Sequence, residues 1–153
     1  MRAVHTPNPF KSYRQVATQT APPGQLVLML FDGALKSLDC ALLGFKCEDF
    51  AERNLAVHNN LTRALDIIRE LNGSLDMAAG GQLAETLRGL YVYFEQRINA
   101  GNFKKSPEPI REITPMLKEL RDSWFTMLTQ QDGDLSAASS VEINRAASSR
   151  FTV

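Results

Sequence analysis

The 153-residue sequence lacks several features that would place it in a specialised class of protein. It has no run of about 18 apolar residues, the length that a membrane-spanning helix needs, so no transmembrane segment is expected. Basic and acidic residues are equal in number, 17 of each, so no net charge attracts nucleic acid or an anionic membrane surface. The first residues contain neither an apolar core nor a small-residue cleavage site, and we expect no secretory signal.

Residues that carry catalysis or bind metals are also scarce. There are two histidines, His5 and His58, and no Glu-x-x-His sequence of the kind that supplies metal ligands in helical bundles. No glycine-rich phosphate loop appears, and neither histidine has an evident partner for a nucleophilic triad. Cys40 and Cys47 lie about 10 Å apart along a helical stretch, too far to bridge. We therefore expect no enzyme activity, no cofactor and no metal, and free thiols in a reducing cytosol.

The remaining composition, 44% apolar and 22% charged residues, is typical of a globular domain. Prolines and polar residues at the start indicate a mobile segment, and small polar residues at the end indicate a disordered tail. Between them the pattern is helical almost without a break. The predicted parts are a mobile N-terminal segment at 1–21, a helical domain at 22–131 and a disordered tail at 132–153.

Start and stop signals divide the helical domain into four stretches. Proline suits the first turn of a helix, and glycine or asparagine suits the residue after its last turn. On these signals the stretches run from Pro22–Pro23 to about Phe45, from about Glu48 to Leu71, from about Gly80 to Ala100, and from Ser106–Pro107 to just before Asp132–Gly133. Pro115 predicts a kink near 111–115 but no break. Short connections make neighbouring helices antiparallel, so we predict an all-α, up-down-up-down four-helix bundle.

The apolar pattern of the first stretch differs from that of the other three. Each of the last three carries one apolar stripe, beginning at Phe50, Leu83 and Ile110 respectively. In the first stretch the apolar residues cover about 200° of the circumference. They are Leu26, Val27, Leu28, Leu30, Phe31, Ala34, Leu35, Leu38, Ala41, Leu42 and Phe45. Either this helix is buried by its own bundle, or the excess is covered by the N-terminal segment, a second copy or a partner.

His58 raises one alternative function, because histidine phosphotransfer domains are also four-helix bundles with an exposed histidine. It lies at the border of its apolar stripe, where it can be exposed. Its neighbours at 59–62 lack the lysine and glycine that such a site uses. We favour a histidine without chemistry. A structural homodimer that uses the apolar excess of the first stretch is a second alternative.

Several sequence blocks stand in a familiar order along the chain. The first stretch contains TAPP at 20–23 followed by QLVLMLFDGAL at 25–35. The other blocks are SYRQV at 12–16, RALDIIRELNGSLD at 63–76, GGQLAETLRGLYVYFEQRINAGN at 80–102 and LKELRDSW at 117–124. Together they resemble the flagellin export chaperones, the FliS family, over about residues 12–128. Pro22 departs from the pattern, because the family usually has a serine there whose capping is worth about 1 kcal/mol.

The resemblance implies a cytoplasmic export chaperone that binds the disordered C-terminal segment of flagellin in a 1:1 complex. In this family the segment becomes helical as it wraps the bundle, which prevents premature polymerisation and keeps flagellin competent for secretion. Other flagellar regulators or co-chaperones are further candidate partners. A homodimer is a candidate state of the chain without its ligand.

The partner-binding residues are predicted from the apolar arc and from the frequency of tyrosine in interfaces. Tyr13 and Val16 are expected to form a lid over part of the arc in the free protein. The outer part of the arc and the third stretch supply the candidate groove residues, which are Leu28, Phe31, Leu35, Leu42, Tyr91 and Tyr93. Plain core packing is the alternative for each of them.

Overall fold

The computed structural model describes the backbone of residues 23–150 and the side chains of residues 23–131. Within this part the chain forms helices and no strand, which confirms the all-α prediction. The helices are α2 (Pro23–Gly44), α3 (Phe50–Gly73), α4 (Gly81–Lys104) and α5 (Glu108–Arg150). Tyr13 and Val16, the predicted lid residues, lie outside the described residues.

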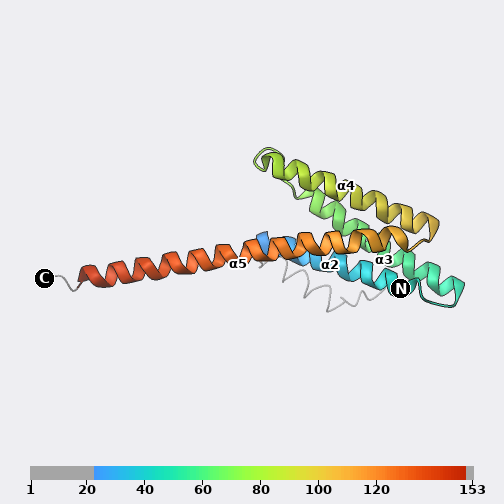
Figure 1. Ribbon diagram of the computed structural model, residues 1–153, viewed down its shortest axis with the longest axis horizontal. Coiled ribbons are helices and arrows are strands. Elements are labelled where there is room, and N and C mark those ends of the chain that lie inside the picture. The colour runs from blue at the N-terminus through green and yellow to red at the C-terminus, as the bar shows by residue number, and fades with distance from the viewer. Residues whose placement is uncertain (1–22, 151–153) are drawn as a thin grey trace, which may run out of the picture.

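Each helix of the bundle packs against two neighbours. α2 packs on α3 and α5, and α4 packs on the same two helices. The connections at 45–49, 74–80 and 105–107 are short, so successive helices run antiparallel (Figure 1). This arrangement is the predicted up-down-up-down bundle, and the C-terminal part of α5 projects well beyond it (Figure 1).

The core of the bundle is built from the predicted apolar stripes. Its largest fully buried side chains are Phe31, Leu38, Val57, Leu61, Ile68, Leu71, Phe94, Ile98, Ile110, Ile113 and Leu117. Burying one such side chain contributes about 1.5–3 kcal/mol, so this cluster supplies most of the driving force for folding. Two stripes begin outside the core. Phe50 is 68% exposed and Leu83 is 64% exposed, because each lies in the first turn of its helix, at an end of the bundle.

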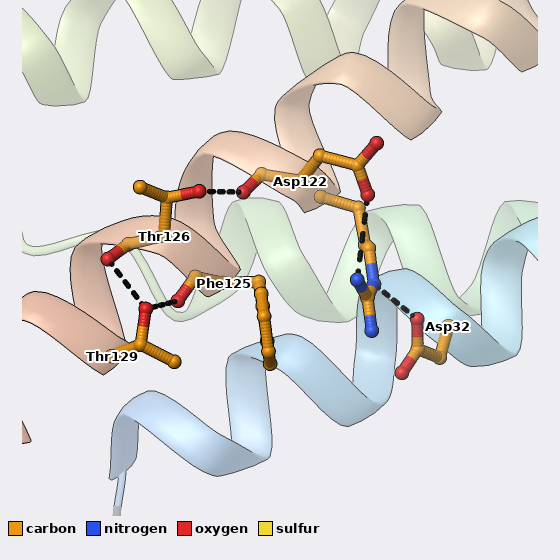
Figure 2. Close-up of polar contacts among 6 residues, drawn as sticks. Asp32, Asp122, Phe125, Thr126 and Thr129 are labelled. Carbon is orange, nitrogen blue, oxygen red and sulfur yellow. Dashed lines mark hydrogen bonds and ion pairs between the residues drawn. The ribbon is translucent and has the colours of Figure 1, made fainter.

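α2 is largely covered by its two neighbours, which accounts for much of its wide apolar arc. On the α3 side, a Cβ added at Gly44 would lie 3.1 Å from the Cβ of Ala56, so the two backbones approach closely. On the α5 side, Arg121 Nε donates to Asp32 Oδ1 at 2.8 Å (Figure 2). The half-exposed residues of the arc lie at both ends of α2 and include Leu26 and Leu30 near its start and Leu35 and Leu42 farther along.

The start of α3 lies close to its predicted position, whereas α4 ends beyond its predicted position. Asp49 caps α3, because its Oδ2 accepts the backbone N–H of Glu52 at 2.9 Å. α4 was expected to stop before Gly101 and instead continues to Lys104. Gly101 is buried, and a Cβ there would lie 3.0 Å from Ile110 Cδ1. This glycine therefore permits close packing of α4 against α5 and does not end the helix.

The last helix is longer than the sequence signals indicate. α5 passes Pro115 without a break, as expected, because Arg111, whose carbonyl loses its usual donor, lies on the exposed face of the helix. The predicted end before Asp132–Gly133 is wrong, since the helix continues to Arg150, through most of the segment for which disorder was predicted. Extending an existing helix needs no new nucleation, and one glycine costs only about 1 kcal/mol.

Candidate functional site

Two adjoining hollows open at the end of the bundle where α2 begins and α3 leads into α4. The first, of about 400 Å³, is lined by Pro23, Leu26, Val27, Met29, Leu30, Glu70 and Ser74. The second, of about 340 Å³, is lined by part of the 74–80 connection together with Val27, Leu83, Ala84, Leu87, Tyr91 and Trp124. Because Val27 and Ser74 line both hollows, we treat them as one depression and name it the end groove.

Three aromatic side chains from three helices lie beneath and beside the end groove. The rings of Phe31 and Tyr91 have centroids 6.5 Å apart, and those of Phe31 and Trp124 have centroids 6.2 Å apart in an edge-to-face arrangement. Trp124 Nε1 donates to the carbonyl oxygen of Gly24 at 2.9 Å, which ties α5 to the first turn of α2. Burial raises the pKa of Tyr91 to about 12, so its hydroxyl stays neutral. The groove therefore has an ordered, uncharged floor.

The 74–80 connection forms one wall of the end groove, and its conformation is fixed by two residues. Asp76 Oδ1 accepts the backbone N–H groups of Ala78 and Ala79 at 3.1 and 3.0 Å. At Gly80 an added Cβ would lie 2.5 Å from the Cβ of Ala84 and 2.7 Å from the carbonyl oxygen of Asp76. Only glycine fits there. Ala79 and Gly80, which line the second hollow, add little side-chain bulk to this wall.

The predicted partner-binding residues of α2 and α4 fall into two groups. Leu28, Phe31 and Tyr91 are buried in the core, with 8%, 0% and 2% of their surface exposed, and Tyr91 also lines the end groove. Leu35 and Leu42 are half-buried against the core. Leu35 lines a separate, shallower hollow between α2 and α5. The predicted residues are thus divided between buried core positions, of which Tyr91 lines the end groove, and half-buried positions at the edge of the core.

Tyr93, the remaining predicted residue, joins α4 to α5. Its hydroxyl donates a hydrogen bond to Glu112, whose carboxylate also pairs with Arg97 at 2.7 Å. The hydrogen bond from Tyr93 is the main cause that lowers the pKa of Glu112, with Arg97 adding to it. The same hydrogen bond raises the pKa of the Tyr93 hydroxyl. In this conformation the hydroxyl is therefore engaged within the bundle.

Close to the aromatic floor, Arg121 links α2 and α5 on the surface. Its guanidinium pairs with Asp32 and lies over the ring of Phe125, 5.1 Å from the ring centroid. The hydrogen bond to Asp32 is the main cause that raises the pKa of Arg121. Figure 2 shows this contact beside Asp122, which also pairs with Arg121. The α2–α5 side of the bundle thus presents paired charges, unlike the end groove.

His58 is exposed on α3, as the phosphotransfer alternative requires, but its surroundings offer no support for that chemistry. Its Nδ1 lies 3.2 Å from the side-chain amide of Asn102 on α4. Among residues 23–131 no group of three or more histidine, cysteine or acidic side chains is placed to hold a metal ion. Within the described helices, none is both long and apolar enough to cross a membrane.

Fold and groove together define a class of protein, an antiparallel four-helix bundle with an apolar groove at one end. Comparison with known families shows to which family of helical bundles this chain belongs. The family model for the flagellar protein FliS matches residues 6–131, and the chain belongs to this family of flagellar secretion chaperones. The flagellar secretion chaperone FliS of Bacillus subtilis is 30% identical over 127 residues, covering 83% of this chain and 91% of the relative. That of Salmonella typhimurium is 32% identical over 126 residues, covering 79% and 90%.

Several residues of the end groove were not among the predicted ones. Leu26, Val27 and Leu30 belong to the predicted apolar arc, but the sequence does not show which edge of the arc stays open. Trp124 lines the groove, although its helical spacing from Ile110 places it on the apolar stripe of the fourth stretch. The small residues at 78–81 were the available signal, because a wall without large side chains leaves its neighbours uncovered.

Proposed function

We propose that this chain is a cytoplasmic export chaperone that binds the C-terminal segment of flagellin in a 1:1 complex. Membership of the FliS family and the names of the relatives, flagellar secretion chaperones, support a flagellar partner. The end groove is the structural observation that carries the proposal, because it is an apolar depression whose floor and wall are held in place by hydrogen bonds.

The groove suits a segment that is disordered in isolation and folds as it binds. Such a segment places apolar anchors into a groove at i, i+3 and i+4. Ordering the segment costs free energy, so the affinity per unit of buried area is modest and release at the export apparatus is easier. While it is bound, the apolar surface that drives filament assembly is covered. This accounts for both parts of the activity, preventing polymerisation and keeping flagellin competent for secretion.

The predicted residues outside the end groove extend the proposed binding surface. Leu35 and Leu42 are half-exposed on the α5 side of α2, where a second part of a wrapping segment would contact them. Tyr93 would join that surface by exchanging its bond with Glu112 for a bond to the partner. Leu28, Phe31 and Tyr91 are buried, so they would contribute mainly by maintaining the shape of this surface.

The chain's own N-terminal segment is proposed to compete with flagellin. It leads directly into Pro23, which lines the end groove. Tyr13 and Val16 would supply the apolar contacts of a lid over this surface in the free protein. Competition of this kind keeps the groove covered until flagellin arrives and lowers the apparent affinity by the fraction of chains that are closed.

Isothermal titration calorimetry with a peptide of the flagellin C-terminal segment tests the proposal. One peptide should bind per chain, with a negative heat-capacity change because apolar surface is buried. Leu26→Ser should weaken binding about tenfold, since it removes apolar area from the groove. Leu43→Ser is the matched control, because Leu43 is 64% exposed near the other end of the same helix. The Leu43→Ser variant should bind the peptide with the affinity of the wild type.

Three results would contradict the proposal. The absence of binding at high micromolar peptide would exclude the flagellin segment as the partner. A stable dimer in light scattering that is indifferent to added peptide would instead favour the structural homodimer. Acid-labile phosphorylation that disappears in His58→Ala would favour the phosphotransfer alternative.

A further inference from the structure

The end groove differs in charge from the other hollows of the bundle. Glu70 lines its first half and Asp76 lines its second half, and no lysine or arginine is among the described residues that line either. By contrast, the hollow at the opposite end of the bundle is lined by Arg53 and Lys105. The hollow between α2 and α5 is lined by acidic and basic side chains together. The charged side chains that line the end groove are therefore all negative, and they attract an occupant that carries a positive charge.

The two carboxylates flank the junction of the two halves. Ser74 lines both halves, and it follows Glu70 by one helical turn and precedes Asp76 in the connection. Asp76 is held in place by the backbone amides of Ala78 and Ala79. Within the described part of the chain, neither carboxylate forms an ion pair. Both are thus available to a cation that arrives with a partner.

The sequence of the N-terminal segment has the matching chemistry. Residues 1–22 contain three basic residues, Arg2, Lys11 and Arg14, and no aspartate or glutamate. Phe10, Tyr13 and Val16 stand next to or near these basic residues. A chain of balanced overall charge thus carries a purely basic, partly apolar segment directly before the acidic groove. This complementarity supports a groove that prefers apolar segments with a cation.

We propose that the end groove selects a partner segment that carries a lysine or arginine beside its apolar anchors, and that Glu70 and Asp76 receive this cation. The inference rests on the proposed function and adds the chemistry by which the partner is recognised. A cation at the junction gains attraction from both carboxylates, whereas an acidic segment of equal apolarity is repelled. The charges therefore contribute selectivity, while the apolar anchors supply most of the affinity.

A charge-exchange experiment on the full chain tests this selectivity. The probes are the C-terminal peptide of flagellin and the same peptide with each lysine and arginine replaced by glutamine. The protein variants are the wild type, the double variant Glu70→Gln with Asp76→Asn, and the control Glu48→Gln, an exposed acidic residue at the opposite end of α3. Asparagine at 76 keeps the side-chain oxygen that accepts the two amides, so the wall should stay folded. Circular dichroism checks this directly.

We expect the affinity to fall about fivefold when either the peptide loses its lysines and arginines or the protein loses the charges of Glu70 and Asp76. Changing both sides together should cause little further loss, because the same interaction is removed twice. The wild-type affinity for the native peptide should fall as salt rises, and that of the double variant should not. Glu48→Gln should bind both peptides as the wild type does.

The possible failures are distinguishable. If neither peptide binds the wild type, the proposed function and this inference are both overturned. If the native and glutamine peptides bind equally well, flagellin binding stands and the charge selectivity is overturned. A native C-terminal segment with no lysine or arginine near its apolar anchors, or an equal loss in Glu48→Gln, would also overturn it.

Discussion

Two glycines, one just before α4 and one within it, differ in how closely their neighbours approach, and the difference shows how a single residue shapes the groove wall. Gly80 stands at the turn before α4, where a Cβ would lie 2.5 Å from the Cβ of Ala84. Gly89 lies within α4, and a Cβ there would meet nothing within 4 Å. The first glycine is required by close packing. The second is exposed, so it carries only the entropic cost of glycine in a helix.

Alanine substitutions at these two positions should therefore shift stability in opposite directions. Gly80→Ala should lower the free energy of unfolding by about 1–3 kcal/mol, because the turn must move away from Ala84 and from the carbonyl of Asp76. Gly89→Ala should raise it by about 0.5–1 kcal/mol, since alanine is the better helix former. Urea denaturation followed by circular dichroism measures both. Equal shifts in the two variants would show that the wall is not packed as described.

At the scale of helices, the sequence predicts what depends on local signals and misses what depends on packing. The predicted start of the second stretch, about Glu48, lies two residues before Phe50, where α3 begins with Asp49 as its cap. Gly101 looks like a helix stop, but its role is contact with Ile110, a residue of the next helix. Such a contact arises only after α4 and α5 have packed. Local propensity therefore defines the helices, and tertiary packing decides how some glycines are used.

The C-terminal part of α5 is the largest difference between expectation and structure. Asp132–Gly133 resembles a stop, yet the helix continues to Arg150. The residues after Pro115 include no further proline, so nothing forbids continuation once the packed part of α5 has formed. This extension projects away from the bundle (Figure 1). Its backbone is helical up to Arg150.

Removal of the extension should leave the bundle intact. A chain that ends at Gln131 keeps every core side chain that the structure describes, so its free energy of unfolding in urea should change by less than about 0.5 kcal/mol. The far-ultraviolet circular dichroism of the truncated chain should show a smaller helical signal than that of the full chain. A marked fall in the urea midpoint would mean that the extension contributes to the stability of the bundle.

For the whole molecule, an apolar excess can be predicted from the sequence more readily than its place on the surface. The arc of α2 predicts an excess of apolar surface, covered either by the chain's own bundle or by the N-terminal segment, a second copy or a partner. Helical periodicity does not determine which edge of the arc the neighbours cover, because that depends on how far α3 and α5 rotate around α2. In the structure the open edge lies at Leu26 and Leu30, next to Glu70. The groove is a property of the assembled bundle, and no single helix contains it.

The position of Trp124 makes occupancy of the end groove directly measurable. It is the chain's one tryptophan, half-buried at the groove, where its indole bonds to Gly24. A flagellin peptide seated in the groove should exclude water from the indole and shift its emission to shorter wavelength. At a free concentration 100 times its dissociation constant, the peptide should also raise the free energy of unfolding by about 2.7 kcal/mol. Stabilisation without an emission change would mean that the segment binds outside the end groove. The α5 side of α2 around Leu35 would then be the next candidate, because binding there leaves Trp124 in its present surroundings.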